Sequence, residues 1–80
     1  MKCDLHGFNL KDAIEEIMES IELCHLLGDN YLLLIHGYRR GQVLKNYIRS
    51  KNFLDDMKEK GFNVKPSKFS NPGASQFKIG

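Results

Sequence analysis

The sequence has only two cysteines, Cys3 and Cys24. Two cysteines do not make a disulfide framework. We expect both thiols to be free and buried, because reduced cysteine packs as a small hydrophobe. A zinc half-site, Cys3-x-x-His6, is the alternative. Structural zinc takes four ligands, and the sequence shows no second pair of ligands to complete such a site.

Long apolar runs are also absent, and none approaches the roughly 18 residues that span a bilayer. The acidic Asp4 falls where a signal peptide carries its apolar segment. We therefore predict a cytoplasmic location and no membrane partner. At 80 residues, the chain has the size of one small domain, which we expect to occupy residues 1–80.

The net charge of +2 hides an uneven distribution of charge along the chain. Residues 1–30 hold two lysines and seven acids, whereas residues 31–80 hold ten basic residues and three acids. A one-sided positive field attracts polyanions and raises their encounter rate. The distribution is consistent with nucleic-acid binding, and equally with a solvated surface that is merely uneven.

The hydrophobic pattern predicts the element order β-α-β-α-β-β. We expect strands over residues 1–6, 31–36, 62–69 and 74–79, with Pro66 marking an edge strand because it lacks a donor. The first helix should run from an Asn9 cap, with Asp12 reaching back, to Gly28. Its apolar side is predicted to comprise Leu10, Ala13, Ile14, Ile17, Ile21, Cys24 and Leu27.

The second half of the chain should contain two shorter helices. One begins just after Gly41, and its inward side chains are predicted to be Val43, Leu44, Tyr47 and Ile48. The pattern Asn52-Phe53-Leu54-Asp55 repeats a capping box, so a break is expected there. A short third helix then ends at Gly61, and Asn71-Pro72-Gly73 forms a turn before the last strand.

A His-Gly pair occurs twice, as His6-Gly7 and His36-Gly37. Each pair follows a predicted strand and precedes a predicted helix. The separation of 30 residues is about one βαβ unit, whose strands lie parallel in one sheet. Both histidines should therefore share the end of the sheet where ligands bind in open α/β folds.

These motifs resemble those of the small MutS-related (Smr) domain family. The residues that carry the resemblance are Asp4-Leu5-His6-Gly7, Leu34-Ile35-His36-Gly37 and the closing Asn71-Pro72-Gly73-Ala74-Ser75. The resemblance covers essentially the whole chain. It implies a two-layer α/β sandwich with a four-stranded mixed sheet, similar to the C-terminal domain of translation initiation factor three. It also implies nucleic-acid binding and, as in several members of the family, nicking of DNA or cleavage of RNA.

Asp4 and His6 are the predicted catalytic residues. Histidine titrates near neutrality and can serve as a general acid or base in phosphodiester hydrolysis. Asp4, two residues earlier on the same strand face, can orient His6 or hold a metal-bound water. The resemblance implies that a divalent metal takes part in some members, here Mg²⁺ or Mn²⁺. The alternative is that both side chains only stabilise the loop.

The predicted nucleic-acid-binding residues lie in the second His-Gly motif and just after it. They are His36, Gly37, Tyr38, Arg39, Arg40, Gly41 and Lys45. The two arginines can hold a phosphate through charge and forked hydrogen bonds, although Arg39 stands where the family commonly has a glycine. Tyr38 can stack on an unpaired base. His36 follows an apolar strand, which favours a structural anchor over an acid or base.

Three functions stay open on the sequence alone. The first is an endonuclease that acts on RNA or on branched or single-stranded DNA through Asp4 and His6. The second is a non-catalytic module that binds the same nucleic acids. The third is an adaptor whose acidic first helix binds a protein partner, which exposed apolar residues on that helix would favour. We expect the chain to be a monomer.

Overall fold

The elements follow the predicted order β-α-β-α-β-β, with the second helical segment divided into two helices at the expected break. The computed structural model describes residues 1–37, 42–68 and 71–80. Its elements are β1 (Lys2–Asp4), α1 (Leu10–Leu27), β2 (Tyr31–Ile35), α2 (Gln42–Ile48), α3 (Lys51–Glu59), β3 (Val64–Pro66) and β4 (Ala74–Ile79). The strands form one sheet in the order β1-β2-β4-β3. β1 and β2 are parallel, and β4 is antiparallel to both of its neighbours, so the predicted mixed sheet is confirmed.

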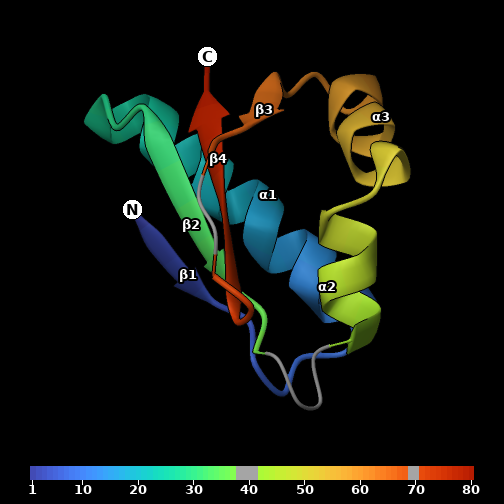
Figure 1. Cartoon of the computed structure of the whole chain (residues 1–80). Coiled ribbons are helices and arrows are strands. Elements are labelled where there is room, and N and C mark those ends of the chain that lie inside the picture. The colour runs from blue at the N-terminus through green and yellow to red at the C-terminus, as the bar shows by residue number, and fades with distance from the viewer. Residues whose placement is uncertain (38–41, 69–70) are drawn as a thin grey trace.

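The helices pack on one face of this sheet. In β2, Leu32 and Leu34 are buried in the core, whereas Tyr31, Leu33 and Ile35 alternate with them and face the other way. In Figure 1 the strands lie in front of α1, with α2 and α3 to the right. The result is a two-layer α/β arrangement whose second sheet face carries no described helix.

The caps of α1 match the sequence prediction. The Asn9 side chain accepts a hydrogen bond from the Asp12 backbone at 2.8 Å, and Gly28 ends the helix in the left-handed region with φ +70. The prediction for Leu27 was wrong, because this side chain is 71% exposed. It lies in the last turn of α1, where no other described element covers that side of the helix.

The predictions for the shorter helices need two corrections. Val43 was expected to point inward, yet it is 67% exposed. In a helix of only seven residues, Leu44 and Ile48 form the buried stripe, and Val43 lies about 100° around from Leu44. The break before α3 also lies earlier than Asn52. Ser50 is the N-cap, and its hydroxyl accepts a hydrogen bond from the Phe53 backbone at 3.3 Å.

The position of the Ser50 cap is tested with a pair of substitutions. Ser50→Ala should lower the free energy of unfolding by about 1 kcal/mol, the usual cost of losing an N-cap side chain. Asn52→Ala is the matched control, because Asn52 is exposed in the first turn of α3 and caps nothing. Urea denaturation of both variants measures the difference. Equal losses would show that Ser50 is not the cap.

Two of the predicted strands are shorter than expected. β1 covers three residues of the predicted 1–6, and β3 covers three of the predicted 62–69, part of which lies outside the described residues. β3 is nevertheless an edge strand, as Pro66 indicated, and β4 has the predicted bounds. Among the residues that the structure describes, we find no helix with the length and apolar composition that a membrane span requires.

Both cysteines are free and buried, as predicted. Cys3 lies in the core, whereas the His6 side chain is exposed, so the Cys3-x-x-His6 zinc half-site does not form. The alternation of side chains along a strand explains the outcome, since residues three apart point to opposite faces.

Candidate nucleic-acid interface

The two His-Gly pairs meet at one end of the sheet. β1 continues beyond Asp4 with a hydrogen bond of 2.8 Å from the Leu5 backbone to the Ile35 carbonyl, which brings both strand ends together. Gly37 has φ +80, and a Cβ placed on it would lie 3.9 Å from the His6 Cβ. We call residues 6–7, 36–37 and 71–73 the His-Gly end; it lies at the bottom of Figure 1.

Asp4 and His6 form a surface pair at this end. The Asp4 Oδ1 accepts hydrogen bonds from the His6 backbone at 3.1 Å and from the His6 Nδ1 at 2.8 Å. The side chains of His6 and Asp4 are 76% and 56% exposed, respectively. With Nδ1–H donating to the carboxylate, Nε2 is the acceptor nitrogen of the neutral ring and is open to solvent.

The electrostatics of the pair keep Asp4 ionised. The hydrogen bond from the His6 side chain, followed by that from its backbone, lowers the pKa of the Asp4 carboxyl below its ordinary value. A fixed carboxylate orients the imidazole and stabilises the imidazolium that forms when Nε2 takes a proton. The geometry is therefore that of a general base with its orienting acid, placed where a substrate can reach it.

His36 occupies a different environment, because its side chain is buried. Its Nδ1 donates to the Gly37 carbonyl at 2.7 Å, and its Nε2 accepts from the Ser75 hydroxyl at 3.0 Å. The Ser75 oxygen in turn accepts from Arg49 Nε at 2.8 Å. Arg49 also donates to the carbonyls of Asn71 and Ala74, at 2.6 and 3.0 Å.

This His36–Ser75–Arg49 network holds the His-Gly end together. The backbone amides of His36 and Gly37 both donate to the Gly73 carbonyl at 3.0 Å. The same arginine therefore fixes the turn before β4, and the same histidine fixes the loop after β2. His36 positions this loop and has no free ring nitrogen to offer a substrate.

The network requires a neutral His36. Burial lowers the pKa of His36 below its ordinary value, and the positive charges of Arg49 and Lys45 act in the same direction, while the hydrogen bond to Gly37 opposes them. A protonated ring could not accept the Ser75 hydrogen bond.

The free energy of unfolding is therefore expected to fall with acidification below a pH of about 6.5. In this range the unfolded chain protonates His36 before the folded chain does, so protons favour unfolding, and stability is full above the unfolded pKa. Urea denaturation between pH 5 and 8 measures the effect, which His36→Gln should reduce. His25→Gln changes an exposed histidine and leaves the network intact; an equal reduction in this control would contradict the assignment.

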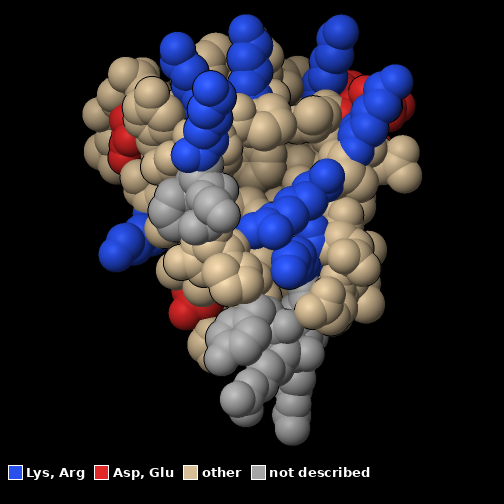
Figure 2. Space-filling model, viewed as in Figure 1, with Lys and Arg blue, Asp and Glu red and all other residues tan. Residues whose placement is uncertain are grey.

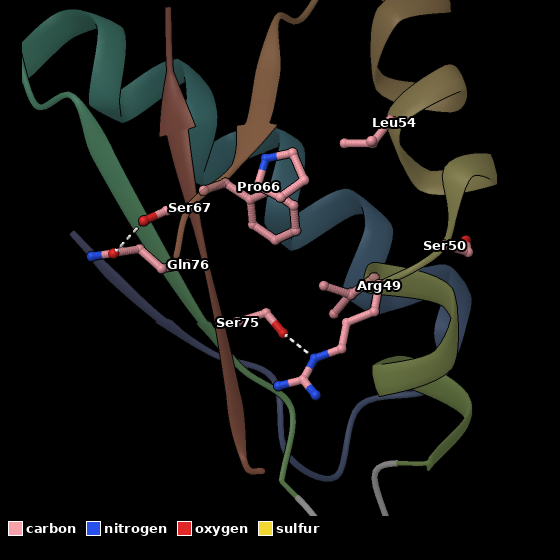
Figure 3. Close-up of a pocket in the computed structure, with 9 residues that line it drawn as sticks. Arg49, Ser50, Leu54, Pro66, Ser67, Ser75 and Gln76 are labelled. Atoms are coloured by element: carbon pink, nitrogen blue, oxygen red, sulfur yellow. Dashed lines mark hydrogen bonds between the residues drawn. The ribbon is translucent and has the colours of Figure 1, made fainter. Parts of the chain in front are cut away.

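A cavity of about 220 Å³ lies beside the network, between α2, α3 and β4. Figure 3 shows Arg49 and Ser75 on its wall, joined by their hydrogen bond, with Pro66 and Leu54 further along. The polar groups that it shares with the network already bond to one another. Arg49, the charged side chain on the cavity wall, is held by three of these hydrogen bonds, whereas the Asp4–His6 pair is exposed and faces solvent. The exposed pair is therefore the better candidate for chemistry.

The remaining predicted binding residues divide into two groups. Tyr38, Arg39, Arg40 and Gly41 lie outside the described residues. Lys45 is half-buried on α2, close enough to His36 for its charge to act there. Sequence reasoning missed the structural roles of Arg49 and Ser75, because 26 residues separate them and only the register of β4 brings them together.

The described part of the chain holds no cluster of metal-binding side chains. No three His, Cys, Asp or Glu side chains gather there around a common point. Asp4 is the one carboxylate of the pair, and its Oδ1 already accepts two hydrogen bonds from His6.

The fold and the paired His-Gly motifs define an Smr domain. The model of that family, described as "Smr domain", matches residues 3–74, which is most of the chain. The chain therefore belongs to the Smr domain family.

Two relatives support this assignment. The chain is 30% identical over 63 residues to endonuclease MutS2 of Finegoldia magna, covering 75% of this chain and 8% of that protein. It therefore spans only a small part of this relative. The crystal structure of the Smr domain of Thermus thermophilus MutS2 superposes with a TM-score of 0.72 at 26% identity, covering 99% of this chain and 96% of that one.

Proposed function

We propose that the chain binds nucleic acid at the His-Gly end and hydrolyses a phosphodiester there with Asp4 and His6. The observation that carries the proposal is the exposed pair itself, with 2.8 Å between Asp4 Oδ1 and His6 Nδ1, beside the loop that begins at His36. Membership of the Smr family and the likeness to part of a protein named as an endonuclease support it.

The chemistry follows from the two ring nitrogens of His6. Nε2 accepts a proton from a water molecule as the water oxygen attacks phosphorus, and the bond from phosphorus to the leaving oxygen breaks. The leaving oxygen takes a proton from solvent. Asp4 stabilises the imidazolium that results. Lys45 and the arginines Arg39 and Arg40 offset the negative charge of the phosphate.

The substitution Asp4→Asn tests catalysis separately from binding. It keeps the size of the side chain but removes the charge that stabilises the imidazolium, so cleavage should fall while affinity is retained. The assay uses labelled single-stranded RNA, single-stranded DNA, duplex and branched DNA, each with and without Mg²⁺ or Mn²⁺. Glu15→Gln on the exposed side of α1 is the matched control. Cleavage that Asp4→Asn leaves unchanged would contradict the assignment.

A non-catalytic binding module is the second candidate. It is favoured by the single carboxylate of the pair and by the lack of a group of metal-binding side chains among the residues described. This candidate predicts salt-sensitive binding that survives Asp4→Asn without any cleavage by the wild type. Replacing Arg39 and Arg40 together with alanine should weaken such binding strongly.

The hypothesis of a protein-binding adaptor is supported by exposed leucines on α1. Leu23, Leu26 and Leu27 are exposed on α1, which is the feature that a docking helix needs. Because α1 has 18 residues, its last turn lies about 25 Å from the first. A protein partner bound at this end would leave the His-Gly end free, so the two roles are compatible.

A further inference from the structure

The sheet face away from the helices is apolar along its middle strand. Tyr31, Leu33 and Ile35 of β2 alternate with the core residues and point to this face. Tyr31 is 47% exposed and the two aliphatic side chains are half-buried. No described helix packs on this open face, so an aromatic ring and two aliphatic side chains form a flat row in contact with solvent.

Lysines flank the Tyr31 and Leu33 part of this row on both sides. Lys78 of β4 lies directly opposite Tyr31, Lys65 of β3 lies directly opposite Lys78, and Lys2 of β1 lies beside Leu33. All three lysines are exposed, and within the described ranges none takes part in a salt bridge. Like charges directly opposite one another in an antiparallel pair destabilise a sheet. A bound polyanion would relieve the repulsion between Lys65 and Lys78.

The two sides of the molecule differ in charge. Figure 2 shows the side on which the strands lie in front, where basic side chains project and few acidic atoms appear. The helix on the other side, α1, exposes acidic residues along its solvent face, namely Asp12, Glu15, Glu19 and Glu22. A polyanion is therefore attracted to the open face of the sheet and repelled from α1.

We propose that the open face binds single-stranded nucleic acid, with an unpaired base stacked on Tyr31 and phosphates held by Lys2, Lys65 and Lys78. An unpaired base offers its ring face to an aromatic side chain, whereas the bases of a duplex are already stacked on one another. This inference rests on the proposed function, and it adds the substrate class and a second contact surface.

The open face extends to the Asp4–His6 pair. Ile35 lies four residues after Tyr31, at the far end of β2. Asp4 pairs with Ile35 in the neighbouring strand and therefore lies on the open face beside it. At about 3.3 Å per residue, the path along the strand is about 13 Å. A single strand laid along β2 from Tyr31 therefore brings its backbone to Asp4 and His6.

The test measures the binding of a fluorescent single-stranded RNA and of a duplex of the same sequence by anisotropy. Tyr31→Ala should weaken single-strand binding about 5- to 150-fold, as expected for the loss of one stacked base. Tyr31→Phe keeps the ring and should bind like the wild type, and neither variant should change duplex binding. Circular dichroism confirms that the variants fold.

The lysines are tested through the salt dependence of binding. Replacing Lys65 and Lys78 together with glutamine should reduce the slope of log affinity against log salt concentration by about 1.4, which corresponds to two single-strand phosphate contacts. Lys51→Gln with Lys11→Gln is the matched control, because these exposed lysines lie on helices. An equal reduction in the control would overturn the assignment of these phosphate contacts.

The outcomes separate this inference from the proposed function. Wild-type protein that binds RNA, together with a Tyr31→Ala variant of equal affinity, overturns the open-face site and leaves the proposed function standing. Wild-type protein that binds neither the single strand nor the duplex at low salt overturns the proposed function itself.

Discussion

Replacing His6 with alanine should lower the rate of phosphodiester cleavage by about 10²- to 10⁴-fold, the usual contribution of a positioned general acid or base. The loss should fall on the rate at saturating substrate, because alanine removes the nitrogen that takes the proton but little of the binding surface. The side chain is 76% exposed, so the fold should be unaffected. Single-turnover cleavage and equilibrium binding, measured on the same RNA, give the two quantities separately.

His25→Ala is the control for this substitution. His25 lies on the exposed side of α1 near its C-terminal end, far from the His-Gly end. It should leave both cleavage and binding unchanged. If His6→Ala cleaves at the wild-type rate, His6 is not the base; a parallel loss of affinity and rate would assign it to binding.

Replacing Arg49 with methionine should have the second large effect, a loss of about 2–3 kcal/mol in the free energy of unfolding. Methionine keeps the apolar stem of the side chain but removes three hydrogen bonds from a charged donor, to Ser75, Asn71 and Ala74. Hydrogen bonds to charged groups contribute about 1.5–3 kcal/mol each, but Arg49 is exposed, so water replaces much of what each of the three bonds supplies and the total is close to that of a single bond. The total is a large fraction of the stability of a domain of this size.

Urea denaturation measures this loss, and Lys51→Met is the matched control on the exposed surface. The control should change stability by no more than about 0.5 kcal/mol, as is usual for surface substitutions. Arg49→Lys should fall between the two, because an ammonium group lacks the planar fork that reaches several acceptors at once. A value for Arg49→Met equal to that of the control would show that the network contributes nothing to stability.

The sequence predicted most of the fold because its local signals agree with the tertiary structure. Asn9 and Gly28 bracket α1 as capping rules predict, and the separation of the two His-Gly pairs indicated a parallel βαβ unit. The apolar alternation in β2 and the Pro66 edge position were equally readable. In each case the residue types decide the conformation within a few positions of the chain.

The predictions were wrong where two residues compete for the same structural role, or where contacts distant in the sequence decide whether a side chain is buried. Serine and asparagine both cap helices well, and α3 begins after Ser50, with Asn52 exposed in its first turn. Leu27 and Val43 fit the helical period but lie beyond the area that the core covers. The Arg49–Ser75 contact depends on the packing of α2 against β4, which no local pattern specifies.

The candidate site was predicted in part. Asp4 and His6 were identified by type and spacing, and the structure brings them within hydrogen-bond distance on the surface. Burial distinguishes His36 from His6 more sharply than the sequence does, since both follow a strand and precede a glycine. The open face of the sheet emerges only from strand order, which places Lys65 and Lys78 opposite each other.

The position of bound nucleic acid shows whether the His-Gly end and the open face of the sheet form one binding surface. Amide chemical shifts of ¹⁵N-labelled protein, followed during titration with a short single-stranded RNA, report which backbone sites the ligand approaches. The predicted result is that the largest changes fall on Leu5 to Gly7, on His36 and Gly37, and along β2 and β4. Changes confined to the acidic solvent face of α1, with the His-Gly end unaffected, would show that nucleic acid does not bind at either surface.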